Sequence, residues 1–206
     1  MDIHLTGLGK KFNRDWIFKN LDISLLSGQS YAIVGPNGSG KSTLLKVIAG
    51  YLPASTGTIT YSNNGMPLSG EDFYKHIIFA APYLELIEEF TLTELLQFHF
   101  KFKKIIPGHS MDSVIELLGL NHSANKFISI FSSVIKQRVK LALAFFSESK
   151  VLFLDEPTVN LDVEGIKWYE DQIKALSGDK LILIASNQKM EYQWATKVIN
   201  ISECKM

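Results

Sequence analysis

Short apolar runs along the chain predict buried β-strands that alternate with amphipathic helices. Three such runs, at residues 31–34, 151–154 and 181–184, contain no charged residue. Their length and composition are typical of parallel strands covered on both faces. Apolar residues at helical spacing predict helices that begin at Lys41 and span 91–104, 112–118, 136–146 and 163–176. This alternation predicts an α/β fold with a parallel-centred sheet covered by helices.

The N-terminal segment has a different pattern. Residues 3–8 and 21–26 are apolar-rich runs separated by a polar turn at 13–15, which predicts a β-hairpin or two neighbouring strands. Further strands are predicted at 57–61 and 76–81 and near 198–201. With 206 residues, the chain is expected to form one domain over 1–206, with a helical subdomain at about 83–150.

The predicted helix at 91–104 begins clearly and ends ambiguously. Thr91 and Glu94 have the spacing of a capping box. Phe98, Phe100 and Phe102 alternate with polar residues, so the helix either buries aromatic side chains on two faces or frays there. Together with the lysines that follow, this stretch is interpreted as core with a solvated basic rim or as a docking surface.

The loop after the first buried run carries the clearest chemical signal. It matches the pattern G-x-x-x-x-G-K-[ST] and lies between a predicted strand and a predicted helix. Its glycines let backbone N–H groups approach phosphate oxygens, and the following helix N-terminus adds partial positive charge. Lys41 is expected to reach the β- and γ-phosphates of ATP, Ser42 to bind Mg²⁺, and Thr43 to donate to the α-phosphate. The predicted ATP-binding residues here are Gly35, Pro36, Asn37, Gly38, Ser39, Gly40, Lys41, Ser42 and Thr43.

An acidic pair follows the second buried run. Asp155 ends the strand predicted at 151–154, and Glu156 follows it directly. Ligands of α/β sheets bind at the carboxyl ends of the strands, so Asp155 is expected to hold Mg²⁺ through a water and Glu156 to act as general base. Two acidic residues after a strand also suit a helix N-cap. The glycine-rich loop at 35–42, here called the phosphate loop, favours the catalytic interpretation of the pair.

With these motifs in place, the chain resembles the ATP-binding subunits of ABC transporters over nearly its whole length. Four stretches carry the resemblance: 35–43, Phe131-Ser132-Ser133-Val134-Ile135-Lys136-Gln137-Arg138, 154–158 and Asn160-Leu161-Asp162. It implies an ABC-type P-loop NTPase fold with N-terminal antiparallel strands and a small α-helical subdomain. It also implies a head-to-tail dimer, as a homodimer or a heterodimer with another ATP-binding subunit, in which Ser132, Ser133 and Asp162 contribute to the nucleotide sites.

The resemblance further implies an aromatic residue that stacks on adenine. Phe12 is the candidate, and Trp16 is the alternative. Either side chain also suits ordinary core packing.

Three positions depart from the family pattern. Pro82 stands where the family has a glutamine that contacts Mg²⁺ and the attacking water, and Val134 replaces the second glycine of the signature. Asn187 stands in place of the switch histidine, so it keeps a hydrogen-bond donor and can never be a cation. Removing one preorganised donor costs about a hundredfold or more in rate, so we expect attenuated ATP hydrolysis.

Composition restricts the possible partners and compartment. The chain has 21 Lys and Arg against 21 Asp and Glu, and this neutrality argues against nucleic acid as a partner. The single cysteine, Cys204, excludes an internal disulfide and fits a reducing cytosol. No signal peptide or membrane span is expected, and the five histidines lack the spacing of a zinc site.

The leading functional hypothesis is an ATP-hydrolysing subunit that powers separate transmembrane subunits from the cytoplasmic face of the membrane. The small size resembles subunits of simple exporters. Two alternatives remain: a soluble ABC-type ATPase with no transport role, and a slowly hydrolysing subunit that pairs with a competent partner in an asymmetric dimer.

Overall fold

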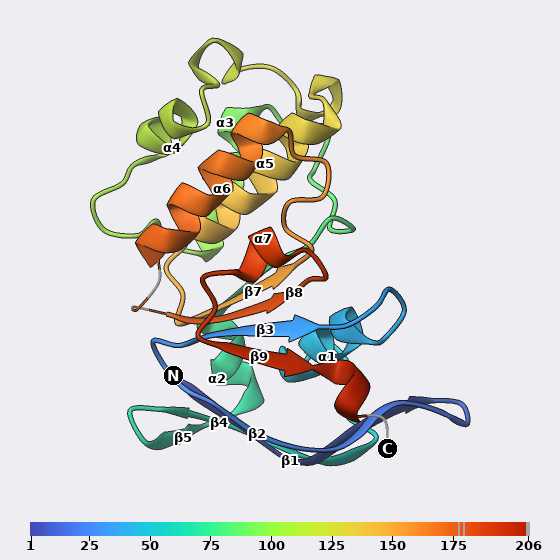
Figure 1. Cartoon of the computed structure of the whole chain (residues 1–206). Coiled ribbons are helices and arrows are strands. Elements are labelled where there is room, and N and C mark those ends of the chain that lie inside the picture. Colours follow the sequence, from blue (N-terminus) through green and yellow to red (C-terminus); the bar gives the residue numbers. More distant parts are fainter. Residues whose placement is uncertain (177, 179, 205–206) are drawn as a thin grey trace. The chain divides into compact units, whose positions relative to one another are not determined.

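The computed structural model of the chain describes residues 1–176, 178 and 180–204 (Figure 1). Its strands are β1 (Asp2–Phe12), β2 (Asp15–Leu25), β3 (Ser30–Val34), β4 (Thr56–Asn63), β5 (Met66–Leu68), β6 (Ile77–Ala80), β7 (Val151–Asp155), β8 (Leu181–Ala185) and β9 (Lys197–Asn200). Its α-helices are α1 (Lys41–Ile48), α2 (Gly70–Lys75), α3 (Leu92–Phe102), α4 (Met111–Leu117), α5 (Ser133–Phe145), α6 (Val163–Leu176) and α7 (Lys189–Tyr192). Short 3₁₀ helices lie at Asn121–Ser123, Ile128–Ile130 and Ile201–Cys204.

The chain forms two compact units, which are described separately. The first, here called the sheet unit, contains residues 1–79 and 149–156 and the described residues from 176 onward. The second, here called the helical unit, contains residues 80–148 and 157–175. Within the described part of the chain, no helix has both the length and the apolar character needed to cross a bilayer.

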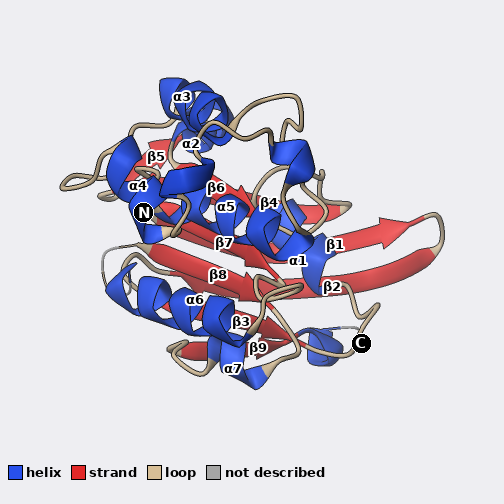
Figure 2. Cartoon of the chain, turned by 90° about the horizontal axis from the view of Figure 1, so that it is seen from above, coloured by secondary structure: helices blue, strands red, loops and turns tan. Residues whose placement is uncertain are grey.

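The sheet unit contains two sheets. One is antiparallel, with strand order β2-β1-β4-β5, and the other has the order β6-β7-β8-β3-β9. The pairs β7–β8, β8–β3 and β3–β9 are parallel, and Figure 2 shows these four strands side by side. The predicted α/β class, with N-terminal antiparallel strands, is confirmed.

The register of the parallel strands determines where the site lies. Ala185 of β8 is paired with Ile33 of β3 on one side and with Asp155 of β7 on the other. The carboxyl ends of these three strands therefore meet at one edge of the sheet. The loop after β3, the acidic pair after β7 and the turn after β8 all begin there.

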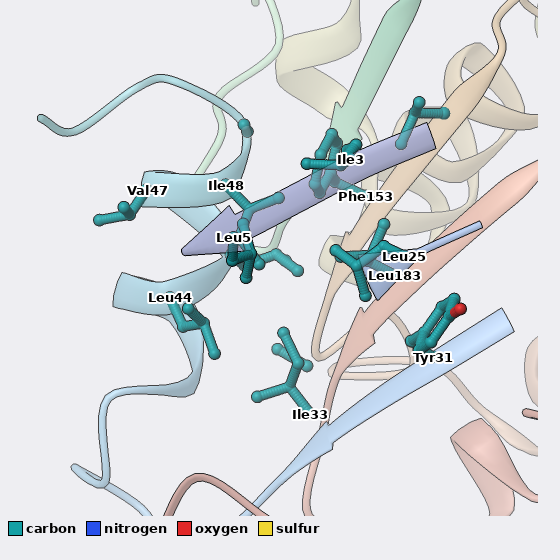
Figure 3. Close-up of a cluster of buried hydrophobic side chains, with 14 of the residues drawn as sticks. Ile3, Leu5, Leu25, Tyr31, Ile33, Leu44, Val47, Ile48, Phe153 and Leu183 are labelled. Carbon is teal, nitrogen blue, oxygen red and sulfur yellow. The ribbon is translucent and has the colours of Figure 1, made fainter. Parts of the chain in front are cut away.

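The core of the sheet unit lies around α1. Leu44, Val47 and Ile48 of this helix are buried with Ile3 and Leu5 of β1, in a cluster that also includes side chains of β3, β7 and β8 (Figure 3). Full burial of such a side chain stabilises the fold by about 1.5–3 kcal/mol. Because α1 begins at Lys41, this packing also fixes the end of the phosphate loop.

The helical unit resolves the ambiguity in the predicted helix at 91–104. Helix α3 continues through Phe102, and Thr91 and Glu94 form the predicted capping box. Phe98 makes edge contacts with Phe90 and Phe102, with ring centroids 5.6 and 5.2 Å apart. The alternating phenylalanines are thus accommodated on a helix, and Phe98 and Phe102 are exposed.

Several short elements were not predicted from the sequence: β5, α2 and α7. Each has six residues or fewer, which is too short for a recognisable hydrophobic period. Helix α2 depends on a local cap instead, because Ser69 Oγ accepts a hydrogen bond from Asp72 N. Strands β1 and β2 extend to 11 residues each through ladder hydrogen bonds that the apolar runs alone did not indicate.

Candidate functional site

The loop between β3 and α1 has the backbone of an anion-binding turn. Ser39 N donates to Pro36 O at 3.1 Å and closes the turn. Gly38 and Gly40 have φ of 75° and 105°, which are values that residues with a Cβ rarely adopt. A Cβ on Gly40 would also collide with Ile17 Cγ2 of β2. The loop therefore requires glycine at this position for both conformation and space.

Lys41 lies inside the loop. The side chain is 5% exposed, and its Nζ donates to Gly35 O at 2.9 Å and to Pro36 O at 3.2 Å. Its charge is thus held where the loop's backbone groups converge, at the N-terminus of α1. This arrangement suits a triphosphate, whose oxygens can take over the lysine hydrogen bonds.

Ser42, at the start of α1, contacts Asp155, at the end of β7. Ser42 Oγ donates to Asp155 Oδ1 at 2.9 Å, although the two residues are 113 positions apart in the sequence. Asp155 is only 1% exposed. A hydroxyl and a carboxylate in contact are oxygen donors of the kind that Mg²⁺ prefers. Both predicted metal ligands therefore lie at one place.

The loop also contains an unsatisfied polar atom. Ser39 is buried, and its Oγ has no hydrogen-bond partner in the described part of the chain. Buried polar atoms without a partner are rare in native proteins and require an explanation, such as a ligand. Together with the buried Lys41 and the Ser42–Asp155 pair, this atom indicates that the residues present fit a magnesium nucleotide.

Glu156 has a backbone conformation unusual for its residue type. Its φ is 42°, in the left-handed region, and its N–H donates to Ala185 O at 2.9 Å. Such strain costs about 1–3 kcal/mol and is concentrated at functional sites. The strained backbone and its bond to β8 fix Glu156 at the edge of the sheet where the phosphate loop begins.

Asn187 contacts the phosphate loop directly. It follows β8, and its Nδ2 donates to Asn37 Oδ1 at 2.9 Å. The structure therefore brings together, within the sheet unit, the loop residues, Asp155, Glu156 and Asn187.

Phe12 and Trp16 lie on opposite faces of the β1–β2 hairpin. Trp16 pairs with Lys11 in the ladder, and a Cβ on Gly9 would lie 2.9 Å from its ring. Phe12 is on the alternate face, where Lys10 Nζ lies 5.0 Å from its ring centroid. That face also carries Ile17, the residue next to Gly40. Phe12 is therefore the aromatic residue that shares a face with the phosphate-loop contact.

Pro82 lies in the helical unit, two residues after the end of β6. Its carbonyl oxygen accepts a hydrogen bond from Lys140 Nζ of α5 at 2.7 Å. Burial lowers the pKa of Lys140 from its ordinary value. A second lysine of α5, Lys136, forms an ion pair with Glu88. Two lysines of α5 thus hold the segment from Pro82 to Glu88.

The signature and the segment 160–162 also lie in the helical unit. Ser132 is the N-cap of α5, with its side chain accepting from Ile135 N, and Ser133 begins the helix. Both serines are exposed, whereas Val134 is half-buried. Asp162 Oδ1 accepts from Gly165 N at 2.8 Å near the start of α6. Ser132, Ser133 and Asp162 thus lie at helix N-termini, and their contribution to a dimer site stays a prediction.

Sequence reasoning missed two side chains of α5 that donate to backbone carbonyls. Lys140 holds the Pro82 carbonyl, and Gln137, which is buried, donates from Nε2 to Pro157 O at 2.8 Å directly after Glu156. From the sequence, Gln137 belongs only to the signature stretch. No periodicity or motif could have paired these residues across 58 and 20 positions.

The fold and this site define a P-loop nucleotide-binding protein, and comparisons with known proteins specify its family. The family model described as "ABC transporter" matches residues 18–159. The chain is 31% identical over 175 residues to the uncharacterized ABC transporter ATP-binding protein YdbJ of Bacillus subtilis, covering 85% of this chain and 57% of YdbJ. It is 28% identical over 190 residues to the lantibiotic transport ATP-binding protein SrtF of Streptococcus pyogenes, covering 90% of this chain and 79% of SrtF.

A solved structure gives the same result for the fold. The ATP-binding cassette MJ0796, in a dimeric post-hydrolysis state bound to ADP and phosphate, matches with a TM-score of 0.80 and 21% identity, covering 96% of this chain and 93% of MJ0796. The chain belongs to the ABC transporter family, and its fold is that of the family's ATP-binding cassettes.

Proposed function

We propose that the chain is the ATP-binding and ATP-hydrolysing subunit of an ABC transporter, and that it powers separate transmembrane subunits from the cytoplasmic face of a membrane. SrtF, whose name assigns it to lantibiotic transport, supports the transport role. The proposed dimer follows the MJ0796 cassette, whose structure is dimeric. The dimer forms either with an identical chain or with another ATP-binding subunit.

The contact between Ser42 and Asp155 carries the proposal. It joins the phosphate loop to the acidic end of β7, so the residues for phosphate binding and for metal binding meet at one edge of the sheet. Bound Mg²⁺ would neutralise charge on the phosphates. Lys41 would donate to phosphate oxygens, and Glu156 would accept a proton from the attacking water.

We further propose that hydrolysis is attenuated. Pro82 has no amide to donate, and Val134 places a β-branched side chain where the family has glycine. Asn187 supplies a neutral amide in place of an imidazole. The buried lysine, the serine of the loop and both carboxylates remain, so slow hydrolysis is expected and complete loss is not.

The test of ATP binding is calorimetric titration of the purified chain with ATP in the presence and absence of Mg²⁺. We expect the wild-type chain to bind ATP, and Lys41→Ala to lose measurable binding because it removes the charge inside the loop. Lys167→Ala removes an exposed lysine of α6 and should bind like wild type. Equal binding by Lys41→Ala and wild type would contradict the assignment of the loop.

The three substitutions favour one second candidate, a slowly hydrolysing subunit in an asymmetric dimer. Turnover measured alone and after mixing with other ATP-binding subunits separates the candidates. Activity that arises only in the mixture supports the asymmetric dimer, whereas fast turnover of the chain alone rejects both the asymmetry and the attenuation.

A further inference from the structure

Strand β1 carries a buried lysine two residues before Phe12. Lys10 is 8% exposed and lies opposite the fully buried Phe18 in the β1–β2 ladder. Among the residues that the structure describes, none forms an ion pair with Lys10. A buried ammonium group is costly unless its surroundings compensate the charge, so the groups around Nζ indicate what the lysine does there.

The ammonium group of Lys10 lies between a carbonyl and an aromatic ring. Its Nζ donates to Pro53 O at 2.7 Å, and it lies over the ring of Phe12, 5.0 Å from the centroid. A cation in this position is attracted to the face of the ring. The carbonyl and the ring therefore compensate the charge together. Because the cation covers one face of Phe12, a base can stack only on the other face.

The carbonyl that Lys10 contacts is fixed relative to α1. Tyr51 N and Leu52 N donate to Lys46 O at 2.8 and 3.2 Å, so the chain folds back over the last turn of the helix just before Pro53. Helix α1 begins at Lys41 in the phosphate loop. A continuous series of ordered groups thus runs from the phosphate loop through α1 and Pro53 to the ammonium group.

The backbone on both sides of Lys10 is attached to the same segment. Ser55 N donates to Gly9 O at 2.7 Å, and Ser55 Oγ accepts from Lys11 N at 3.1 Å. The end of β1 that carries Phe12 is therefore held to the segment after α1 by backbone hydrogen bonds. Within this framework, the ammonium group of Lys10 is the contact that reaches the Phe12 ring itself.

We propose that Lys10 is a positioning residue for Phe12, and that it sets where the adenine of ATP stacks relative to the phosphate loop. This inference rests on the proposed function, because it requires ATP on the loop and its base on Phe12. Lys10 acts through the ring and makes no contact with the nucleotide. Lys11 offers a matched control, because its Nζ lies 5.4 Å from the ring centroid of Trp16 on the opposite face of the hairpin.

The first experiment tests the contact without nucleotide. Ring signals of Phe12 are observed by ¹³C–¹H correlation spectroscopy and assigned through their loss in Phe12→Ala. Lys10→Met keeps the length of the side chain and removes the charge, so we expect it to shift these signals. Lys11→Met removes the matched charge over Trp16 and should leave them in place. Unchanged Phe12 signals in Lys10→Met would overturn the contact.

The second experiment measures affinity for ATP and for inorganic tripolyphosphate, which has phosphates and no base. Loss of a cation–π contact should weaken ATP binding roughly 2- to 10-fold in Lys10→Met. Affinity for tripolyphosphate should change less than twofold, and Lys11→Met should bind both ligands like wild type. In a Phe12→Ala background, Lys10→Met should change the Kd for ATP less than twofold, because the ring through which Lys10 acts is absent.

A second variant separates the charge from the hydrogen bond. Lys10→Gln removes the cation and retains a donor for the Pro53 carbonyl. It should weaken ATP binding in the same range as Lys10→Met, and it replaces that variant if thermal unfolding shows that Lys10→Met does not fold. Affinity for ATP equal to that of wild type in Lys10→Gln would overturn the role of the charge.

The outcomes separate the inference from the proposed function. Equal weakening of ATP and tripolyphosphate binding by folded Lys10→Met would overturn the positioning role, because the charge would then act on the phosphates. Losses that multiply in the double variant would overturn action through Phe12. Failure of the wild-type chain to bind ATP would overturn the proposed function itself, and the spectroscopic experiment would still test the contact between Lys10 and Phe12.

Discussion

Replacing Phe12 and Trp16 one at a time separates adenine stacking from hairpin packing. Phe12 is 46% exposed and lies on the face of the hairpin that carries Ile17, next to the phosphate loop. Trp16 is 37% exposed and covers Gly9 on the other face. We therefore expect Phe12→Ala to affect nucleotide affinity and Trp16→Ala to affect stability.

The magnitudes follow from these positions. Stacking of a base on an aromatic ring is worth about 1–3 kcal/mol, so Phe12→Ala should raise the Kd for ATP roughly 5- to 150-fold. Truncating a fully buried Trp costs about 3–5 kcal/mol, and the partial burial of Trp16 reduces this to roughly 1–2 kcal/mol. That loss corresponds to a fall in Tm of about 2–8 °C for a chain of this size.

The assays are calorimetric titration and thermal unfolding, with inorganic tripolyphosphate as the control ligand. This anion has phosphates and no base, so its affinity should be the same in Phe12→Ala and wild type. A greater loss of ATP affinity in Trp16→Ala than in Phe12→Ala would refute the assignment. An equal loss of tripolyphosphate affinity in Phe12→Ala would refute the stacking mechanism.

Three further predictions concern the helical unit. Pro82→Gln should raise ATP turnover roughly 10- to 100-fold, because it restores a side-chain amide donor. The backbone carbonyl that accepts from Lys140 is retained in this variant. Unchanged turnover in a phosphate-release assay would contradict the proposal that the missing amide at position 82 slows hydrolysis. Thr91→Ala removes the capping box of α3 and should lower the free energy of unfolding by about 1 kcal/mol in denaturant titration, whereas no loss would contradict the role of the cap. Burial lowers the pKa of His99, so the stability contributed by its neutral imidazole is present above the ordinary histidine pKa and is lost as pH falls toward the lowered value. The Tm measured from pH 7.5 to pH 5 should therefore fall less steeply in His99→Gln than in wild type. An identical pH dependence of Tm in the two proteins would contradict the lowered pKa of His99.

Hydrophobic pattern predicted the parts of the fold that have strong, long signals. The runs at 31–34, 151–154 and 181–184 became β3, β7 and β8, because strands covered on both faces must be apolar throughout. The glycine pattern at 35–42 predicted the loop because each glycine there has a backbone or packing requirement. The helix at 91–104 was predicted from its cap, whereas the aromatic alternation left the end of the helix undecided. The structure continues the helix through Phe102, with Phe98 and Phe102 exposed.

Contacts between side chains far apart in sequence could not be predicted in this way. The Asn37–Asn187 pair, the bond from Lys140 to Pro82 and the left-handed backbone of Glu156 depend on the three-dimensional meeting of strand ends and helices. No local pattern encodes them. The resemblance to a family identified Pro82 and Asn187 as departures, and the structure adds what each now contacts.

Single-turnover hydrolysis tests the central claim most directly. The purified chain, in excess over ATP labelled at the γ-phosphate and with Mg²⁺ present, should release labelled phosphate slowly. Glu156→Gln, which keeps the size of the side chain and removes the base, should retain bound ATP and release at least about 100-fold more slowly. Release at the same rate by both proteins would contradict the account, as would absence of ATP binding by the wild-type chain.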